Sequence, residues 1–541
     1  MNLNQLMQAG HRSKEMSRTR RFFFVGLILL LVALLAALFD YVSSHYTAAI
    51  KQFTMIDRPA RLSPDYTDLI VPPNIAPLNF LILEDGISYC AKISSASGQT
   101  IEVFSKSPEI IIPQKPWSRL LTANRGKELH IDIFAKADDG RWNRFQTLTN
   151  TIANEEIDDY LVYRKIMPAH GRWSDIGIRQ RNLTNYDEAT ILDNSSFREG
   201  CLNCHSFWNN RPDKMTIGIR SPLYGSSVLL IEDGEAQKVG TKFGFTTWHP
   251  SGKVIAYSIN EVYQYFHSAR SEVREVIDRS SMLAYYLLDS ETAKTTPEIS
   301  RADRLETYPT WSPDGKYLYY SSARMPKGNT DLGPPRDYTE IKYDLMRISY
   351  DLASDEWGSA ETILSTKQTG RTHTLSRISP DGRWLLFCMS DYGGFPAFAP
   401  SSDLYMIDLK AVEENGRYEY KRLPINSDES ESWHSWSSNS RWIVFSSKRL
   451  HGVFTRVYIS HIDEDGNAGK PILLPQKNPT FYDSHLRTFS VPELIIEPIP
   501  LAKEQLGRVV RNSPDILVDA VTRATEKAGT AIAPNPYGER E

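Results

Sequence analysis

The segment Trp311–Ser321 decides the fold, and it reads Trp-Ser-Pro-Asp-Gly-Lys-Tyr-Leu-Tyr-Tyr-Ser. Its proline presets one turn dihedral and its Asp-Gly pair permits a positive φ, so the middle of the segment predicts a tight turn. The apolar run that follows is typical of an inner strand covered on both faces. The segment therefore predicts a strand, a tight turn and a second strand.

The same pattern occurs four times, with the other copies at Trp248–Ser258, Ile378–Phe387 and Trp436–Ser446. The last copy carries Ser-Asn-Ser at 438–440 in place of Pro-Asp-Gly. A second alternating pair of runs follows each copy, which gives four strands per repeat, and such sheets stacked radially make a β-propeller. The copies begin 58 to 67 residues apart, more than the ~40–45 residues of a minimal blade, which predicts long loops on one face. The alternative is an unrelated β-sandwich with coincidental turns.

These repeats resemble the TolB-like, WD-repeat-like propeller family, whose consensus is Trp-Ser-Pro-Asp-Gly-Lys/Arg, and the resemblance covers roughly residues 240–475. It implies architecture rather than function, because propellers of this type host binding, scaffolding and catalysis alike. Four blades are evident. Residues 215–240 and 473–500 either supply further blades or close the ring by sharing strands. We expect the propeller over 221–500 and a carboxyl-terminal tail over 501–541, which after Pro514 is either peripheral or disordered.

An apolar run of 18 residues, Phe22–Phe39, lies near the amino end. As a helix it spans about 27 Å, the thickness of a hydrocarbon core. Basic residues precede it, so the positive-inside rule predicts a cytoplasmic tail over 1–21, a single-pass transmembrane anchor over 22–40 and an extracytoplasmic, periplasmic location for the rest. A cleaved signal peptide is the alternative, although its apolar region is usually shorter and no clean Ala-x-Ala site follows. The basic flank and the lack of a polar face oppose a buried core helix.

The chain between the anchor and the repeats divides into three parts. Residues 41–70 show little periodicity and predict a tether. Residues 71–155 alternate between apolar and polar side chains with turn residues between the runs, which predicts a small β-sandwich of immunoglobulin-like type. Residues 156–220 form a connector that carries a short Cys-x-x-Cys-His segment. The predicted fold class is therefore mainly β, and a net charge of −4 argues against nucleic acid as a partner.

The segment with the strongest chemical signal is Cys201-Leu202-Asn203-Cys204-His205. Two thiols separated by two residues each form a thioether to one vinyl group of a haem, and the next residue supplies an axial nitrogen. The spacing is the signature of c-type haem attachment. We therefore predict one covalent haem c on Cys201 and Cys204, with His205 as the proximal iron ligand.

Three other chemistries compete for this segment. A zinc site normally needs a second Cys/His pair at finger-like spacing, and none lies nearby in the sequence. A thioredoxin-like redox pair sits at the start of a helix in a βαβ unit, whereas these surroundings predict strands and loops. A disulfide between residues three apart is strained. The remaining cysteines, Cys90 and Cys388, lie in strand patterns and are predicted to be buried thiols, with a long-range disulfide between them as the alternative.

The predicted sixth ligand of the iron is Met215, ten residues beyond His205 and after a Pro-Asp turn. The alternatives are a core role for this methionine, which is the commoner one, His249 or His434 as the ligand, or an open sixth position. Aromatic residues next to the motif are candidates to cover a haem edge, and nearby basic residues are candidates to neutralise the propionates. These residues are Phe207, Trp208, Arg211, Lys214 and Arg220.

The sequence holds no dinucleotide fingerprint, P-loop, Gly-x-Ser-x-Gly elbow or His-Glu-x-x-His motif. The leading hypothesis is electron transfer with a redox protein partner or a membrane complex. One alternative is a binding or assembly scaffold whose haem is structural or sensory. Another is a haem oxidoreductase with an open distal site. An electron-transfer or binding protein is favoured over a substrate-converting enzyme.

Overall fold

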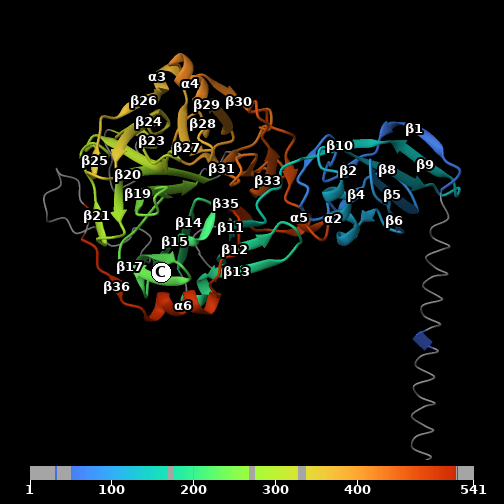
Figure 1. Ribbon diagram of the computed structural model, residues 1–541, viewed down its shortest axis with the longest axis horizontal. Coiled ribbons are helices and arrows are strands. Elements are labelled where there is room, and N and C mark those ends of the chain that lie inside the picture. Colours follow the sequence, from blue (N-terminus) through green and yellow to red (C-terminus); the bar gives the residue numbers. More distant parts are fainter. Residues whose placement is uncertain are drawn as a thin grey trace, which may run out of the picture.

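The computed structural model describes residues 31–32, 50–167, 175–198, 200–266, 274–326, 337–519 and 521, and these residues form mainly β structure (Figure 1). The expected basic tail over 1–21 and the expected anchor over 22–40 lie outside the described residues, apart from Leu31 and Val32, which are helical. Within the described part of the chain, no helix has both the length and the apolar character needed to cross a membrane.

The smaller, amino-terminal part contains two sheets and one helix. Helix α2 (Gln114–Ala123) buries Trp117, Leu120 and Leu121. The larger sheet consists of β1 (Thr54–Pro59), β3 (Ile70–Val71), β5 (Ser88–Ser95), β6 (Ile101–Ser105), β8 (Glu128–Lys136), β9 (Trp142–Gln146) and β10 (Leu148–Ile152). The smaller sheet consists of β2 (Leu62–Ser63), β4 (Phe80–Ile82) and β7 (Glu109–Ile110).

This domain departs from the sequence prediction in three ways. The expected tether over 41–70 is not a tether from Thr54 onward, because β1, β2 and β3 belong to the two sheets. The pairs β1–β9 and β3–β10 are parallel, unlike an antiparallel immunoglobulin sandwich, and α2 was not predicted. Strand β1 is exposed along most of its length, so its sequence shows no alternation; its pairing with a strand some 90 residues away defines it.

The larger part is a β-propeller of six sheets in the described residues, here called blades 1 to 6 from the chain order of their strands (Figure 1). Blade 1 consists of β35 (Thr488–Ile495), β11 (Tyr160–Ile166), β12 (Ile176–Asn182) and β13 (Glu188–Asp193). Blade 2 consists of β14 (Cys201–Trp208), β15 (Arg211–Ser221), β16 (Gly225–Glu232) and β17 (Glu235–Val239), joined by β36 (Asp515–Ile516). Blade 3 consists of β18 (Thr246–Trp248), β19 (Val254–Phe266), β20 (Arg274–Leu287) and β21 (Thr292–Lys294).

Blade 4 consists of β22 (Arg304–Trp311), β23 (Tyr317–Arg324), β24 (Asp344–Asp351), β25 (Glu356–Trp357) and β26 (Glu361–Leu364). Blade 5 consists of β27 (Thr372–Ile378), β28 (Trp384–Ser390), β29 (Asp403–Asp408) and β30 (Tyr420–Arg422). Blade 6 consists of β31 (Glu431–Trp436), β32 (Trp442–Ser447), β33 (Arg456–His461) and β34 (Ile472–Leu473). Short helices lie between strands: η1 (Asn194–Phe197), η2 (Tyr338–Glu340), α3 (Thr366–Thr369), η3 (Pro396–Phe398), α4 (Leu409–Asn415), α5 (Phe481–Ser484) and α6 (Lys503–Asn512).

The ring of blades is closed by a strand from near the carboxyl end of the chain. The innermost strands β14, β18, β22, β27, β31 and β35 contact one another in this order, and β35 also contacts β14. Strand β35 pairs antiparallel with β11, from more than 300 residues earlier (Figure 1). Residues 473–500 thus close the ring by sharing a strand, one of the two options that the sequence left open. Closure of this kind removes the exposed strand edges of an open sheet.

Because of this closure, the observed domain boundaries differ from the predicted ones. The propeller begins at Tyr160 rather than at residue 221, because the predicted connector over 156–220 forms β11 to β13 and the first two strands of blade 2. The predicted carboxyl-terminal tail contributes α6, which buries Leu506 and Val510, and β36, which extends blade 2. The sequence did not reveal this because blade 1 lacks the Pro-Asp-Gly turn and takes its inner strand from elsewhere in the chain.

The smaller domain packs against the propeller at blade 6. The Asp158 carboxylate accepts hydrogen bonds from the Ser438 N–H at 2.8 Å and the Ser438 hydroxyl at 2.6 Å. The Asn79 side chain donates to the Lys477 carbonyl at 2.9 Å. One continuous apolar cluster contains side chains of the smaller domain and of blades 5 and 6.

The repeated turn has one construction in blades 4, 5 and 6. The hydroxyls of Ser312, Ser379 and Ser437 each donate to the side chain two residues on, at 2.5 to 2.6 Å. Ser440 has φ +62°, close to the +73° of Gly315 in the equivalent turn. The Ser-Asn-Ser copy at 438–440 therefore forms the same turn as Pro-Asp-Gly.

Replacing Gly315 with alanine is expected to destabilise the propeller more than replacing Gly382. Both glycines have positive φ, +73° and +79°, so each alanine costs about 1–2 kcal/mol for its backbone. A Cβ at Gly315 would also lie 2.4 Å from Nε2 of His249 in blade 3, whereas one at Gly382 has no neighbour within 4 Å. Urea unfolding should give Gly315→Ala an additional loss of about 1–3 kcal/mol, the usual cost of overpacking. Equal losses in the two variants would contradict this account of the turn.

Candidate functional site

Five of the six innermost strands, all except β18, carry a β-bulge beside the central channel. In β22, β27, β31 and β35 the first bulge residue is Tyr308, Leu375, Trp433 or Val491, and each has φ between +45° and +55°. Bulky side chains rarely adopt this left-handed conformation. All four line one cavity of about 30 Å³ inside the channel. Such strain persists only where the surrounding structure holds it, and it concentrates at functional sites.

The Cys-x-x-Cys-His segment lies on β14, which carries the equivalent bulge. Leu202 pairs with Ile219 and His205 pairs with Ile217, so that Asn203 and Cys204 occupy the bulge. Cys204 and His205 line the same small cavity, while Cys201 is buried in the apolar cluster between blades 1 and 2. All four cysteines of the chain are free and buried, so Cys90 and Cys388 form no disulfide.

His205 is a potential metal ligand of this site with unfilled bonding capacity. It is 1% exposed, and neither ring nitrogen makes a hydrogen bond of normal geometry among the described residues, although backbone groups of Val162 and Val491 lie near enough to act on its pKa. Burial, together with the positive charges of Arg164 and Arg377, lowers its pKa to about 3, so the imidazole is neutral. Neutral imidazole is the form that binds metal ions. A buried polar group left unpaired costs about 1–3 kcal/mol, which a ligand on the ring would recover.

The donor groups fit haem c. Two free thiols at the required spacing accompany an imidazole whose nitrogens are both available. The cavity itself is too small for a porphyrin, because about 30 Å³ holds roughly two water molecules. A second cavity of about 390 Å³ adjoins it, since Arg377 lines both. A porphyrin at this motif therefore requires the channel wall to move.

Met215 lies beside His205 on the same sheet and not opposite it. Met215 pairs with Phe207 across β14 and β15, two positions from the pair His205–Ile217, which places its side chain on the same sheet face as His205. It is fully buried in the apolar cluster of blades 1 and 2. Axial His and Met ligands hold a haem iron from opposite sides of the ring. Met215 as the sixth ligand therefore stays a prediction, and the described packing is that of a core methionine.

The rival histidines have partners on both ring nitrogens. His249 contacts the Ser251 hydroxyl at 2.7 Å and the Gly315 carbonyl at 3.1 Å. His434 contacts the Leu386 carbonyl at 3.2 Å and the Cys388 thiol at 3.8 Å. Both histidines therefore serve turn and blade packing in the described structure, unlike His205.

The residues proposed to surround a haem are only partly brought together. The ring centroid of Phe207 lies 5.7 Å from that of His205, whereas Trp208 donates its indole N–H to Pro250 of the next blade. Arg211 and Lys214 form ion pairs with Asp213 and Glu232. Burial raises the thiol pKa of Cys201 and of Cys204, and the positive charges of Arg164 and Arg220 oppose this rise without cancelling it.

Sequence reasoning missed two charged residues of the channel, Arg377 and Glu493, which form an ion pair at 3.3 Å. The sequence did contain a signal for Arg377. The residue immediately before each repeat copy occupies one level of the channel wall, and these residues are Thr247, Thr310, Arg377 and Ser435. Aligning the copies would have shown one arginine among hydroxyl residues. Glu493 lies outside the repeats, and only strand closure places it there.

The sheets and their closed ring define a mainly-β protein that joins a β-propeller to a smaller β domain. No protein-family model and no curated protein matches the chain. Similar solved structures include Kuenenia stuttgartiensis hydrazine synthase, at 15% identity and a TM-score of 0.28, over 50% of this chain and 65% of that chain. An oligogalacturonate lyase from Vibrio parahaemolyticus matches at 11% identity and a TM-score of 0.32, over 71% of this chain and 100% of that chain.

A puromycin hydrolase matches at 15% identity and a TM-score of 0.31, over 58% of this chain and 45% of that chain. This chain thus covers less than two thirds of the hydrazine synthase and puromycin hydrolase chains. No activity is assigned to this chain from these similarities.

Proposed function

We propose that this protein is a membrane-anchored, extracytoplasmic c-type haem protein that transfers electrons to or from a protein partner. The observation that supports it most directly is His205, a buried neutral imidazole with two unpaired nitrogens next to two free thiols. The thiols of Cys201 and Cys204 would hold the haem, and His205 would supply the proximal nitrogen. A bound haem iron gains or loses one electron at a time.

The channel wall supports this chemistry through its polarity. Phe245, Tyr308, Leu375 and Trp433 surround the cavity that Cys204 and His205 line. These aromatic and aliphatic groups limit water access on their part of the wall, whereas Thr246, Ser376 and Arg377 make the rest of the lining polar. Solvent access and local polarity are means by which a protein tunes a redox potential. A single haem passes one electron at a time, and we propose a redox protein or a membrane complex as its partner.

A second candidate is a haem oxidoreductase with an open sixth position. Two observations favour it. Met215 packs on the same sheet face as His205, and the 390 Å³ cavity offers room for a small ligand beyond Arg377.

The test of the haem proposal is a pyridine haemochrome assay on the full chain made in a host that matures c-type cytochromes. We expect one haem per chain and a covalent mass increase, both absent from the Cys201→Ala/Cys204→Ala variant. The matched control is Cys90→Ala/Cys388→Ala, which also removes two buried thiols and should keep the haem. A wild-type chain that folds but carries no haem-linked mass would refute the proposal.

Absorbance spectra of the same preparations distinguish the two candidates. If Met215 binds the iron, Met215→Leu abolishes the methionine–iron charge-transfer band of the oxidised protein. If the sixth position is open, the wild-type spectrum is high-spin and shifts with cyanide, and Met215→Leu leaves it unchanged.

A further inference from the structure

The mouth of the central channel is a cavity of about 390 Å³ that lies between the inner strands of all six blades. This volume is in the range of small-molecule sites. The lining side chains are mainly hydroxyl, indole and amide groups, and they carry one positive and one negative charge. The lining includes Thr310, Arg377, Ser435, Glu493, Trp248 and Trp311.

Arg377 and Glu493 stand at the same level of the channel as His205. In each of the three inner strands, this residue is the first one after the bulge that pairs with the neighbouring strand. His205 pairs with Ile217, Arg377 with Leu386, and Glu493 with Val162. The register therefore aligns the charged pair with the proposed iron ligand, on strands from three different blades.

The positive charge of Arg377 is only partly compensated. Its guanidinium carries five N–H donors, and Glu493 is its ion-pair partner among the described residues, through one contact at 3.3 Å. Burial raises the pKa of Glu493 to about 7, so its protonated and ionised forms are both populated near neutral pH. The Arg377 side chain remains 31% exposed, which leaves donors free toward the cavity.

Several hydrogen-bond donors around this mouth are buried and have no partner among the described residues. The Ser435 hydroxyl is buried without a partner among the described residues, and the residue is 8% exposed. The indole N–H groups of Trp248 and Trp311 are also buried and unpaired within the described structure. Glu493 is the only carboxylate among the described residues that line the mouth. A cavity with this balance is complementary to a ligand rich in acceptor oxygens.

We propose that the channel mouth binds a small oxyanion, a carboxylate or an inorganic oxyanion, with Arg377 as its charge partner and the Ser435 and Thr310 hydroxyls as further donors. Arginine suits this role because its planar fork matches a carboxylate bidentately. The site goes beyond the proposed redox function, since none of these residues is a haem ligand. The oxyanion has two possible sources with the same chemistry: a propionate of a haem held on β14, or a free anion from solution.

The experiment measures anion binding by titration calorimetry on the full chain in two forms, haem-loaded and produced without haem maturation. The probes are acetate, succinate and inorganic phosphate in an oxyanion-free buffer. We expect binding of at least one probe to the haem-free chain, and Arg377→Gln should weaken it at least tenfold. Glu493→Gln should strengthen it, because that change removes the competing negative charge. Arg301→Gln, which alters an exposed arginine elsewhere, is the matched control and should leave binding unchanged.

Comparing the haem-loaded and haem-free chains identifies the source of the oxyanion. If only the haem-free chain binds, a propionate fills the mouth of the haem-loaded protein; if both forms bind, the ligand is a free anion. Arg377→Lys, which keeps the charge, should retain part of the affinity, and unfolding midpoints show whether each variant is folded. Failure of every probe to bind the folded haem-free chain would overturn the proposal, as would binding that Arg377→Gln leaves unchanged. Neither result depends on whether the chain carries haem.

Discussion

Ending the chain after Ser484 is expected to abolish the cooperative unfolding of the propeller. The truncation removes β35, which supplies the innermost strand of blade 1 and completes the ring. Four large side chains of β35 are buried: Phe489, Val491, Leu494 and Ile495. At about 1.5–3 kcal/mol for each buried side chain, their loss approaches or exceeds the entire stability of an ordinary domain.

The loss also exposes a strand edge. Strand β11 would lose one of its two antiparallel partners and present unpaired backbone groups, which favours aggregation. We expect the truncated chain to show a broad, non-cooperative transition in circular dichroism and to elute as aggregate. The control ends the chain after Asp519 and keeps every described helix and strand, so its transition should match that of the full chain. A truncation after Ser484 that unfolds at the wild-type midpoint would show that β35 does not close the ring.

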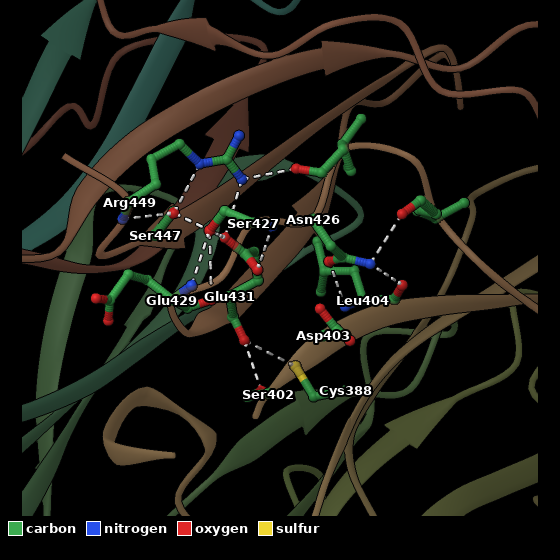
Figure 2. A network of polar contacts seen from close by, with 12 residues as sticks. Cys388, Ser402, Asp403, Leu404, Asn426, Ser427, Glu429, Glu431, Ser447 and Arg449 are labelled. Atoms are coloured by element: carbon green, nitrogen blue, oxygen red, sulfur yellow. Dashed lines mark hydrogen bonds and ion pairs between the residues drawn. The ribbon is translucent and has the colours of Figure 1, made fainter. Parts of the chain in front are cut away.

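Replacing Arg449 with methionine is expected to lower the free energy of unfolding by about 3–5 kcal/mol, the cost of breaking a buried ion pair by removing one partner. Figure 2 shows the network concerned. The Glu431 carboxylate is fully buried and accepts hydrogen bonds from Arg449 at 2.9 Å, Ser447 at 2.8 Å and Ser427 at 2.6 Å. Without Arg449 this carboxylate has no cation to compensate its charge within the described network.

Urea unfolding of three variants tests this account. Glu431→Gln keeps a side-chain acceptor for the hydroxyls and should cost less than Arg449→Met. The matched control is Arg422→Met, because Arg422 pairs with Asp403 at 2.7 Å but is 49% exposed, and such surface pairs contribute about 0–1 kcal/mol. A loss in Arg449→Met no larger than in Arg422→Met would contradict the role of the network.

The network also bears on the channel. Glu431 belongs to β31, two residues before Trp433, whose strained bulge lines the cavity of Cys204 and His205. The Ser402 hydroxyl in blade 5 donates to the Glu431 carbonyl at 2.7 Å, which ties this strand to its neighbour (Figure 2). The same contacts that stabilise blade 6 thus hold one wall of the proposed haem site.

The features that could be predicted from the sequence are those encoded within a few consecutive residues. The Ser-Pro-Asp-Gly turns follow from local dihedral preferences, and the structure confirms the β-propeller that they predicted. The Cys-x-x-Cys-His spacing is equally local, and it identified a histidine whose nitrogens are unpaired in the folded chain. Even the divergent Ser-Asn-Ser copy forms the expected turn.

The tertiary structure alone decided the features that join distant residues. It made residues 156–220 part of the propeller, brought Arg377 within 3.3 Å of Glu493 across 116 residues, and placed Met215 beside His205 instead of opposite it. The physical reason is that a turn depends on its own backbone preferences, whereas the partner of a strand depends on which faces and edges the rest of the chain leaves to be covered. Single-sequence patterns record the first kind of information and not the second.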